Sequence, residues 1–223
     1  MTRVVKVCRS CGREKLLTHH GVNCSVCLAR IKRHGDAHQY AIRPNHLEPY
    51  LRIVQRVRER NVHLNWDAIH SRWDVVVNHA KDFLAEWRAG KAIISYHRSG
   101  AEAIVTLSEK VDAKDVIDTA IAMYLMDEFE PNRFQSFVAF KTQLVRAIRK
   151  LDKGNLTRHR SKHQQGQTST LNELHPHSVE YIASLIVPTL GVVGAHVAKL
   201  ERTKEEKERE EKNAMYAELD KLV

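Results

Sequence analysis

The sequence predicts a mostly α-helical protein that begins with a small four-cysteine zinc finger and ends in a long charged helix. Two observations carry this prediction. All four cysteines of the 223-residue chain lie within its first 27 positions, and apolar residues then recur at intervals of three and four, which is typical of amphipathic helices. We therefore expect a zinc finger at residues 1–36, a helical domain at 45–151, a basic polar linker at 152–169 and C-terminal helices at 170–223.

The cysteines form two Cys-x-x-Cys pairs with twelve residues between them: Cys8 and Cys11, then Cys24 and Cys27. Zn²⁺ prefers four thiolate or imidazole ligands in a tetrahedron, and two thiolates three positions apart can chelate one ion from a tight turn. Gly12 suits such a turn because glycine tolerates positive φ. The spacing predicts one bound zinc, and the alternatives are two disulfides or four unrelated thiols. A knuckle, a short hairpin and a helix are expected, as in a treble-clef or ribbon-like finger.

The second cysteine pair opens a predicted helix that ends at Gly35, since glycine is common directly after a helix C-terminus. Leu28 and Ile31 are expected on the inner side of this helix. Its exposed faces carry three cations that we expect to contact phosphates or bases: Arg30, Lys32 and Arg33. A solvated cationic surface without a partner is the alternative, because charge alone supplies only non-specific attraction.

Residues 8–36 resemble the short zinc-binding segment found in many bacteriophage proteins, some of which are HNH homing endonucleases. The shared pattern is C-x-x-C…G-x-N-C-x-x-C-x-x-R-x-x-R-H-G-D, over about thirty of the 223 residues. The resemblance implies a phage-like origin and a role in nucleic-acid binding. The chain departs from the endonuclease pattern at Ala37, where those proteins have proline, and no HNH constellation follows.

Charge is distributed unevenly along the chain. Residues 1–60 hold thirteen Lys and Arg against four Asp and Glu, and residues 140–165 hold eight against one. The segment 61–139 holds eight against twelve. Two basic regions that flank an acidic middle indicate a polyanionic partner. Metal-binding cysteines indicate a reducing compartment, and the N-terminus lacks the apolar run of a secretory signal. We therefore expect a cytoplasmic protein, inside a host bacterium if it is phage-encoded.

Two apolar stripes predict the first half of the helical domain. One helix begins at Asn45, and its opposite face carries three arginines that either extend the basic surface of the finger or are simply solvated: Arg52, Arg56 and Arg60. The next helix is capped by Asn65. Its stripe includes three tryptophans that we assign to the core rather than to base stacking: Trp66, Trp73 and Trp87. Residues 93–110 are ambiguous between helix and strand.

Two further helices are predicted before residue 151. Asp112 and Asp115 suit the first turn of one helix, which Pro131 ends. Asn132 is expected to cap the other, whose basic last turns are explained by the helix dipole alone. Positive charge continues into the linker at 152–169. There we expect a flexible arm that holds nucleic-acid backbone, with a plain solvated linker as the alternative; its cations are Arg158, Arg160 and Lys162.

The C-terminal region combines a polar joint, an apolar run and a charged helix. Thr170 and Glu173 match a capping box for a short helix that Pro176 ends. Residues 181–198 contain no Asp, Glu, Lys or Arg and approach the length of a membrane span. The proline and two glycines within that run favour a buried helical pair over a membrane helix. Residues 199–220 are expected to form a solvated helical extension, since they lack an apolar heptad.

Taken together, these features favour a zinc-finger protein that binds nucleic acid, DNA rather than RNA, in a phage or mobile element. It would act as a regulator or as an accessory of replication or recombination. One alternative is a zinc-stapled adaptor that docks on a host enzyme such as a polymerase. Another is a nuclease, although the chain has no phosphate-binding loop and no known hydrolase motif. We expect a protein without enzymatic activity.

Overall fold

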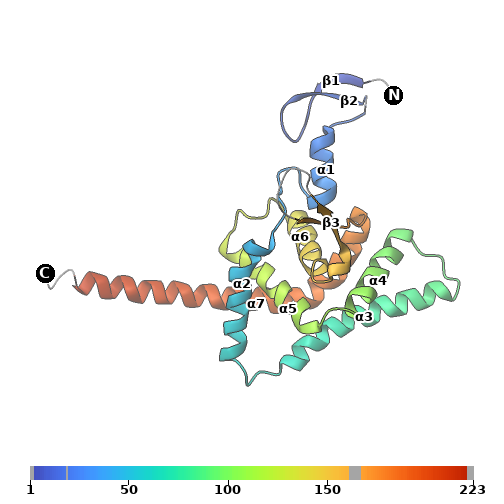
Figure 1. The fold of residues 1–223 in the computed structure, drawn as a ribbon. Helices are drawn as coiled ribbons and strands as arrows, with labels where there is room; N and C mark the ends of the chain where they lie inside the picture. The colour runs from blue at the N-terminus through green and yellow to red at the C-terminus, as the bar shows by residue number, and fades with distance from the viewer. Residues whose placement is uncertain (1–2, 19, 161–166, 220–223) are drawn as a thin grey trace.

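The computed structural model of the chain describes residues 3–18, 20–160 and 167–219. The protein is mostly helical, as the sequence predicts. Figure 1 shows three parts: a small N-terminal finger at one end, a central body of packed helices, and a long C-terminal helix that extends away from that body. We use the term finger for residues 1–36 and helical body for the helices that follow it.

The finger consists of a two-stranded hairpin and one helix. Strand β1 (Arg3–Val7) pairs antiparallel with β2 (Glu14–Thr18), and helix α1 (Ser25–His34) follows. The first cysteine pair lies in the turn between the strands, where Gly12 has φ 67°. The predicted knuckle and hairpin are therefore one unit, because the knuckle is the hairpin turn. The predicted glycine turn and the helix that begins at the second cysteine pair are confirmed.

Five helices of the helical body follow in chain order: α2 (Pro44–Arg60), α3 (Trp66–Arg88), α4 (Ser95–Ser108), α5 (Ala113–Phe129) and α6 (Phe137–Arg149). Helix α5 lies at the centre, in contact with α2, α3 and α6 and with the last helix of the chain. Its side chains are buried around most of its circumference. A helix enclosed on all sides needs apolar residues on all sides, which explains why α5 shows no single apolar stripe.

The helix starts agree only in part with the sequence. Asn65 caps α3 as predicted, since its side chain accepts a hydrogen bond from the backbone three residues later (3.0 Å). Helix α2 begins at Pro44, one residue before the predicted Asn45, because proline fits the first helical position. Helix α6 is capped by Ser136 and not by Asn132. The ambiguous segment 93–110 contains helix α4.

The tryptophan stripe of α3 is only partly in the core. Trp73 is buried, with 2% of its surface exposed. Trp66 and Trp87 lie at the margin, where guanidinium groups cover their rings: Arg58 stands 4.2 Å from the first ring centroid and Arg98 4.6 Å from the second. The assignment of these tryptophans to the core is therefore confirmed fully for Trp73 alone.

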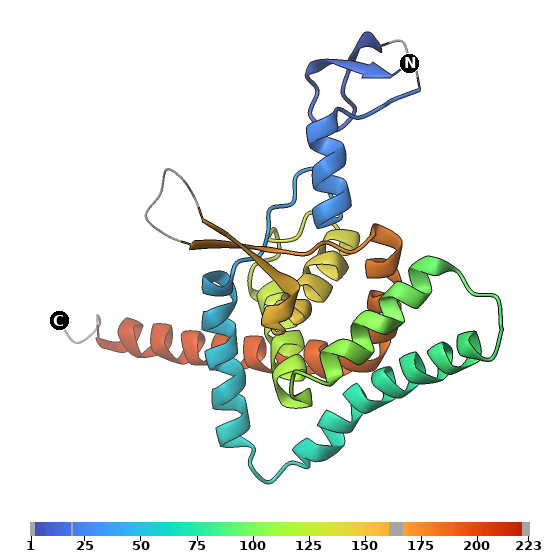
Figure 2. The same ribbon diagram turned by 45° about the vertical axis from the view of Figure 1, so that its right-hand side comes forward.

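Residues 153–160 and 167–171 form regular structure where a flexible arm and linker were predicted. A short 3-10 turn, η1 (Lys153–Asn155), leads into β3 (Leu156–Arg160), which pairs antiparallel with β4 (Gln167–Leu171). Figure 2 shows this hairpin beside the helical body. Leu171 is buried, so strand pairing and burial of its side chain outweigh the local capping-box pattern. The predicted capping box is wrong, because Thr170 lies in β4 and not at a helix start.

The last helix, α7 (Pro176–Leu219), is continuous over 44 residues where a helical pair and a charged helix were predicted. It begins at Pro176, the residue that was predicted to end a short helix. Pro188 is exposed and lies within the helix without ending it. Neighbouring helices hold α7 in place on its other side, which offsets the hydrogen bond that proline removes. Gly191 and Gly194 face the ring of Tyr124 on α5; a Cβ on Gly191 would lie 2.5 Å from the tyrosine oxygen. Because these glycines have no side chain, α7 can pack closely against α5.

Among the described residues, α7 is the one helix that is long and apolar enough to cross a membrane, by length and composition only. Core helices pass the same test. In the structure 39% of its apolar window is buried, and this part of α7 contacts α3, α4, α5 and α6. The apolar side chains that face these helices include Ile182, Ile186 and Leu190.

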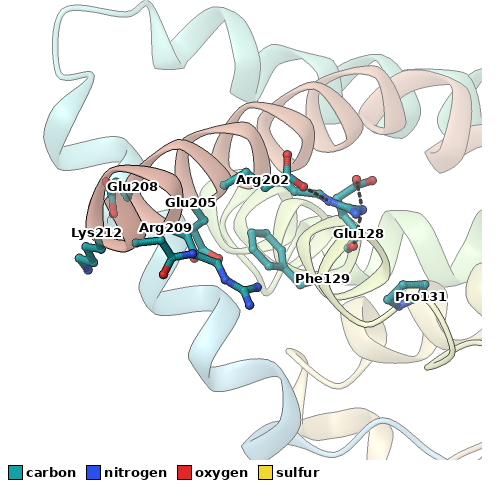
Figure 3. A pocket seen from close by; sticks show the side chains of 10 residues that line it. Glu128, Phe129, Pro131, Arg202, Glu205, Glu208, Arg209 and Lys212 are labelled. Carbon is teal, nitrogen blue, oxygen red and sulfur yellow. Dashed lines mark hydrogen bonds and ion pairs between the residues drawn. The ribbon is translucent and has the colours of Figure 1, made fainter. Parts of the chain in front are cut away.

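Ion pairs fix the point where α7 leaves the helical body. Arg60 donates two hydrogen bonds of 2.8 Å to the carboxylate of Glu201, and Arg202 pairs with Glu128 at 2.8 Å. Figure 3 shows the open groove of about 600 Å³ beside the second pair. Charges of both signs line it and Arg202 also pairs with Glu206 at 3.0 Å. The groove thus lies where the extended part of α7 leaves the helical body.

Candidate metal centre and basic surface

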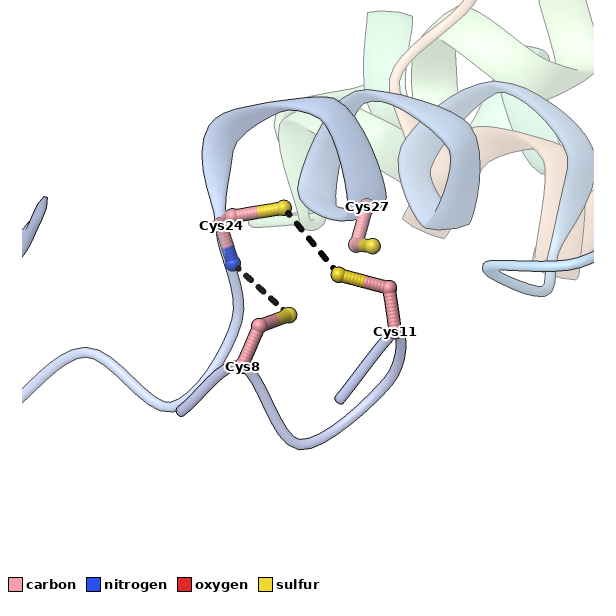
Figure 4. Close-up of side chains that lie close together, drawn as sticks. All are labelled: Cys8, Cys11, Cys24 and Cys27. Carbon is pink, nitrogen blue, oxygen red and sulfur yellow. Dashed lines mark hydrogen bonds between the residues drawn. The ribbon is translucent and has the colours of Figure 1, made fainter. Parts of the chain in front are cut away.

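The four cysteine sulfur atoms of the finger all lie within 4.8 Å of one another. Figure 4 shows them converging from two elements, Cys8 and Cys11 from the hairpin turn, Cys24 and Cys27 from the start of α1. They are free thiols, with 4.0 Å between the sulfurs of Cys11 and Cys24, so the disulfide alternative is wrong. Among the described residues this is the one group of His, Cys, Asp or Glu placed to hold a metal ion.

Backbone hydrogen bonds set the positions of the sulfurs. The N–H of Gly12 donates to the carbonyl of Cys8 (2.9 Å), which closes the knuckle. The N–H of Cys24 donates to the sulfur of Cys8 (3.2 Å), which joins the two pairs. Cys24 is also the N-cap of α1, and Cys27 lies in its first turn. A helix N-terminus and nearby N–H groups favour thiolate, the form that binds metal.

The thiols of the cluster differ in acidity. Backbone N–H groups, first that of Cys24 and then that of Cys11, lower the pKa of Cys8 to about 6. The backbone N–H of Cys27 lowers the pKa of Cys24. Burial, followed by the neighbouring sulfurs, raises the pKa of Cys27 to about 12. Several thiolates cannot stay ionised side by side without a cation between them, so the cluster has the electrostatics of a metal site.

The finger has a very small apolar core. Cys8, Cys24 and Cys27 are buried with Leu17 and Ala37, and Cys11 and Ile31 pack partly against them. Leu28, expected on the inner side of α1, is exposed. The reason is the hairpin, which covers only the face of α1 that carries the cysteines. Without a metal, this core would bury little apolar surface.

Helix α1 docks its C-terminal end on α6 of the helical body. Gly35 has φ 85°, and its N–H donates to the carbonyl of Ile31 (2.8 Å), so it ends the helix as predicted. A Cβ at Gly35 would also lie 2.7 Å from the carbonyl oxygen of Val138 and 2.7 Å from the hydroxyl of Thr142. The glycine therefore has two roles: it permits the left-handed turn, and it permits the close approach of α6.

A buried glutamine joins the finger, the following loop and α6. Gln143 is 1% exposed. Its Oε1 accepts from the N–H of Ile42 (3.0 Å), and its Nε2 donates to Nδ1 of His34 (3.2 Å). Burial, followed by the charge of Arg146, lowers the pKa of His34 to about 4. The imidazole is thus neutral at pH 7, which is the form that accepts the glutamine hydrogen bond.

The predicted cations of α1 lie in three different surroundings. The guanidinium of Arg30 stands 5.1 Å from the ring centroid of Tyr40. Lys32 is exposed and lines a groove of about 200 Å³ between α1, α6 and α7. Arg33 pairs with Glu173, with 3.6 Å between Nε and Oε1. These three cations lie on one helix, and all reach the finger surface.

The predicted cations of the arm fall largely outside the description. Arg158 and Arg160 lie on β3, and their side chains, like the whole of Lys162, are outside the part of the chain that the structure describes. Their predicted contact with nucleic acid stays a prediction. His19 also lies outside the described residues, and His20 lies in the turn after β2.

Sequence reasoning missed a group of buried cations on α6. Arg146 and Arg149 are each 6% exposed, although both had been explained by the helix dipole. Arg149 follows the buried Val145 by four residues, so it lies on the apolar stripe of the helix. A charged residue at a core position of the periodic pattern was the available signal.

Comparison of the chain with family models, curated proteins and solved structures finds no match. The fold and the site themselves define the class: a mostly helical protein with a long C-terminal helix, whose N-terminal cluster of four cysteines can hold a metal ion.

Proposed function

We propose that the protein binds one zinc ion through its four cysteines and binds nucleic acid, DNA rather than RNA, through the finger. The observation that carries the proposal is the set of cations at the surface of α1, where Lys32 is exposed and Arg30 is half-buried. The cysteine cluster holds one end of this helix and α6 holds the other. A metal-stapled helix that presents cations on a fixed scaffold is suited to contact with phosphates and base edges.

The donor set supports zinc as the metal. Zn–S bonds of about 2.3 Å in a regular tetrahedron place the sulfurs about 3.8 Å apart. The sulfurs of Cys11 and Cys24, 4.0 Å apart, need only a small contraction to reach that value. Four soft thiolates suit Zn²⁺, whereas Mg²⁺ and Ca²⁺ prefer oxygen ligands. In this role Zn²⁺ is structural, since all four positions are taken by protein ligands.

The charge of the finger supports a polyanionic partner. Residues 1–36 hold eight Lys and Arg against two acidic residues. Figure 1 shows the β1–β2 hairpin of the finger standing clear of the helical body, which includes the acidic segment 61–139. The hairpin β3–β4, which carries Arg158 and Arg160, would add contacts to the phosphate backbone from a second position. The resemblance of residues 8–36 to phage zinc-binding segments is the reason for placing the protein in a phage or mobile element, in the cytoplasm of a host.

A salt series tests this function directly. Binding of labelled duplex DNA, single-stranded DNA and RNA would be measured by fluorescence anisotropy from low to physiological salt. Replacing Arg30 and Lys32 by alanine should lower the affinity and flatten the slope of log affinity against log salt by about 1.8, since each lost phosphate contact contributes about 0.9.

The matched control replaces Arg88 and Lys114, two exposed cations of the helical body, by alanine. It removes the same charge and should leave the slope nearly unchanged. Equal slopes for the finger variant and the wild-type protein would contradict the proposal. Equal loss in both variants would assign the binding to net charge and not to the finger.

A second candidate function, a protein-binding adaptor, is favoured by one feature of the finger hairpin. Val5 pairs with Leu16 across the two strands, and Val7 lies two positions further on the same face. These side chains are 65%, 64% and 61% exposed respectively. An apolar strand face on a small module suits contact with a protein surface. Under this function, nucleic acid would bind weakly, and Val5→Ser with Leu16→Ser would abolish capture of a host enzyme but leave the salt slope for DNA unchanged.

A further inference from the structure

Four cations and one carboxylate gather where the finger helix docks on α6. We call this group the junction cluster: Arg33, Arg146, Arg149, Lys150 and Glu173. It combines residues of α1, of α6 and of the segment that links β4 to α7. Two of the arginines are almost fully buried. Buried charges are normally matched by opposite charges, so two buried arginines that share one half-exposed carboxylate need an explanation.

The carboxylate of Glu173 already occupies the place between two of these arginines. One of its oxygens contacts Nη1 of Arg146, and the other lies 3.6 Å from Nε of Arg33. Glu173 belongs to a short connecting segment, and its side chain is 36% exposed. The position between the arginines therefore accepts an anion and is open to solvent.

Arg149 is left without such a partner. Its Nε is buried and makes no hydrogen bond among the described residues, and the same is true of Nε of Arg146. The carboxylates that act on Arg149 are engaged elsewhere: Glu173 with the other arginines, and Asp152 with Lys110 at 3.4 Å. A buried N–H that donates no hydrogen bond is unfavourable, so Nε of Arg149 would gain from an acceptor.

The other neighbours do not supply the missing negative charge. The amino group of Lys150 donates to the carbonyl of Ile42 (2.7 Å). Burial, followed by the charge of Arg146, lowers the pKa of Lys150, and burial lowers the pKa of Arg149. His34 is neutral beside them for the same two reasons. The surroundings thus disfavour each of these cations, which is the condition under which a bound anion is favourable.

We propose that the junction cluster binds a phosphate group, which replaces the Glu173 carboxylate between Arg33 and Arg146 and also contacts Arg149. Phosphate carries more charge and more acceptor oxygens than a carboxylate, and the planar donors of arginine match it. The phosphate is either free or part of a nucleic-acid backbone. The first case is independent of the function proposed above, and the second deepens it.

Two variants of opposite expected effect test the proposal. The full-length chain, supplied with Zn²⁺, would be titrated with inorganic phosphate against chloride of equal ionic strength at pH 7, and Kd taken from the rise in Tm. Arg149→Met should weaken phosphate binding by about tenfold or more, the size of a lost hydrogen bond to a charged group. Glu173→Gln should strengthen it by roughly tenfold, because the competing carboxylate is removed. Arg88→Met, an exposed arginine of α3, should leave Kd unchanged.

The same variants distinguish the two sources of phosphate when titrated with a short duplex DNA. A response to inorganic phosphate that follows the expected order assigns the site to free phosphate. A response only to duplex, with the same order, assigns it to the backbone. Equal Kd values for the wild-type, Arg149→Met and Glu173→Gln proteins with both ligands would overturn the proposal. If Arg149→Met does not fold, a Kd of Glu173→Gln equal to that of the wild-type protein would by itself overturn the proposal. The finger variant lacking Arg30 and Lys32 keeps this cluster, so loss of DNA binding there leaves the phosphate test intact.

Discussion

The finger and the helical body hold their structures in different ways. The buried core of the finger consists mainly of its cysteines, with Leu17 and Ala37 beside them. The body has a continuous core of aliphatic and aromatic side chains around α5. Metal binding contributes about 10–16 kcal/mol in small zinc fingers, whereas the body is stabilised by apolar burial. Under the proposed zinc binding, folding of the finger depends on the metal, whereas folding of the body depends on its apolar core.

The largest effect is expected from loss of a cysteine. Cys24→Ser removes one of the four thiolates of the cluster and leaves the backbone of the N-cap position in place, so the finger should lose its metal and unfold. Elemental analysis should fall from about one zinc per chain to none, while the helical signal of the body persists in circular dichroism. A chelator should reproduce this result with the wild-type protein. Unfolding of the whole chain in either case would show that the body also depends on the metal.

The converse change acts on the body. Trp73→Ala removes a large side chain that is 2% exposed, and should lower the free energy of unfolding of the body by about 3–5 kcal/mol. Bound zinc should stay at one equivalent. Trp87→Ala, at the margin of the core, is the control and should have a smaller effect. A similar loss in both variants would show that burial does not decide the stability of this region.

A third change tests how firmly the two regions are joined. Gln143→Leu leaves the N–H of Ile42 without its acceptor and His34 without its donor, at a cost of about 1–3 kcal/mol. Hydrogen exchange in the last turn of α1 should become faster while the metal stays bound. Gln135→Leu, at an exposed position before α6, should change stability by less than about 0.5 kcal/mol. Unchanged exchange in Gln143→Leu would show that the finger docks by other contacts.

The smallest effect is a pH dependence of the same junction. The pKa of His34 is about 4 in the folded protein and near 6.5 when unfolded, so the unfolded chain binds the proton more readily between these values. The contribution of neutral His34 to the free energy of unfolding is fully present above pH 6.5. It declines as the pH falls towards 4, by roughly 1–2 kcal/mol once partial exposure is allowed for. Denaturant unfolding of wild-type and His34→Gln proteins from pH 7 to pH 4 measures it. Parallel curves would contradict this assignment.

Local patterns predicted the finger well, because each signal acts within a few residues. Two Cys-x-x-Cys pairs, Gly12 in the knuckle and Gly35 after α1 all lie where the spacing places them. The same kind of signal succeeded at Asn65 and failed at Asn132, where Ser136 is the cap. Which residue caps a helix depends on where the chain turns towards the core. Several residues near α6 have side chains that can cap a helix, so the local pattern did not identify the right one.

The segments after α6 were predicted least well, since their structure depends on distant partners. Strand β4 forms because it pairs with β3 and buries Leu171. Helix α7 continues through Pro188 because the helices packed on its other side hold both halves in line. Neither the pairing with β3 nor the packing against these helices could be predicted from a sequence window of ten residues.

Residue type and local spacing were enough to predict the four-cysteine cluster, the helical class and the basic character of the finger. These depend on residue type and on spacings of three or four, which act through local geometry. The docking of the finger on α6 through Gly35 and Gln143, and the burial of Arg146 and Arg149, depend on tertiary packing and were not predicted. Burial of a charge depends on which distant segments cover it, and here those segments are α1 and the chain around Glu173. The sequence pattern attributed these cations to the helix dipole, whereas in the fold they are buried and form a positively charged junction.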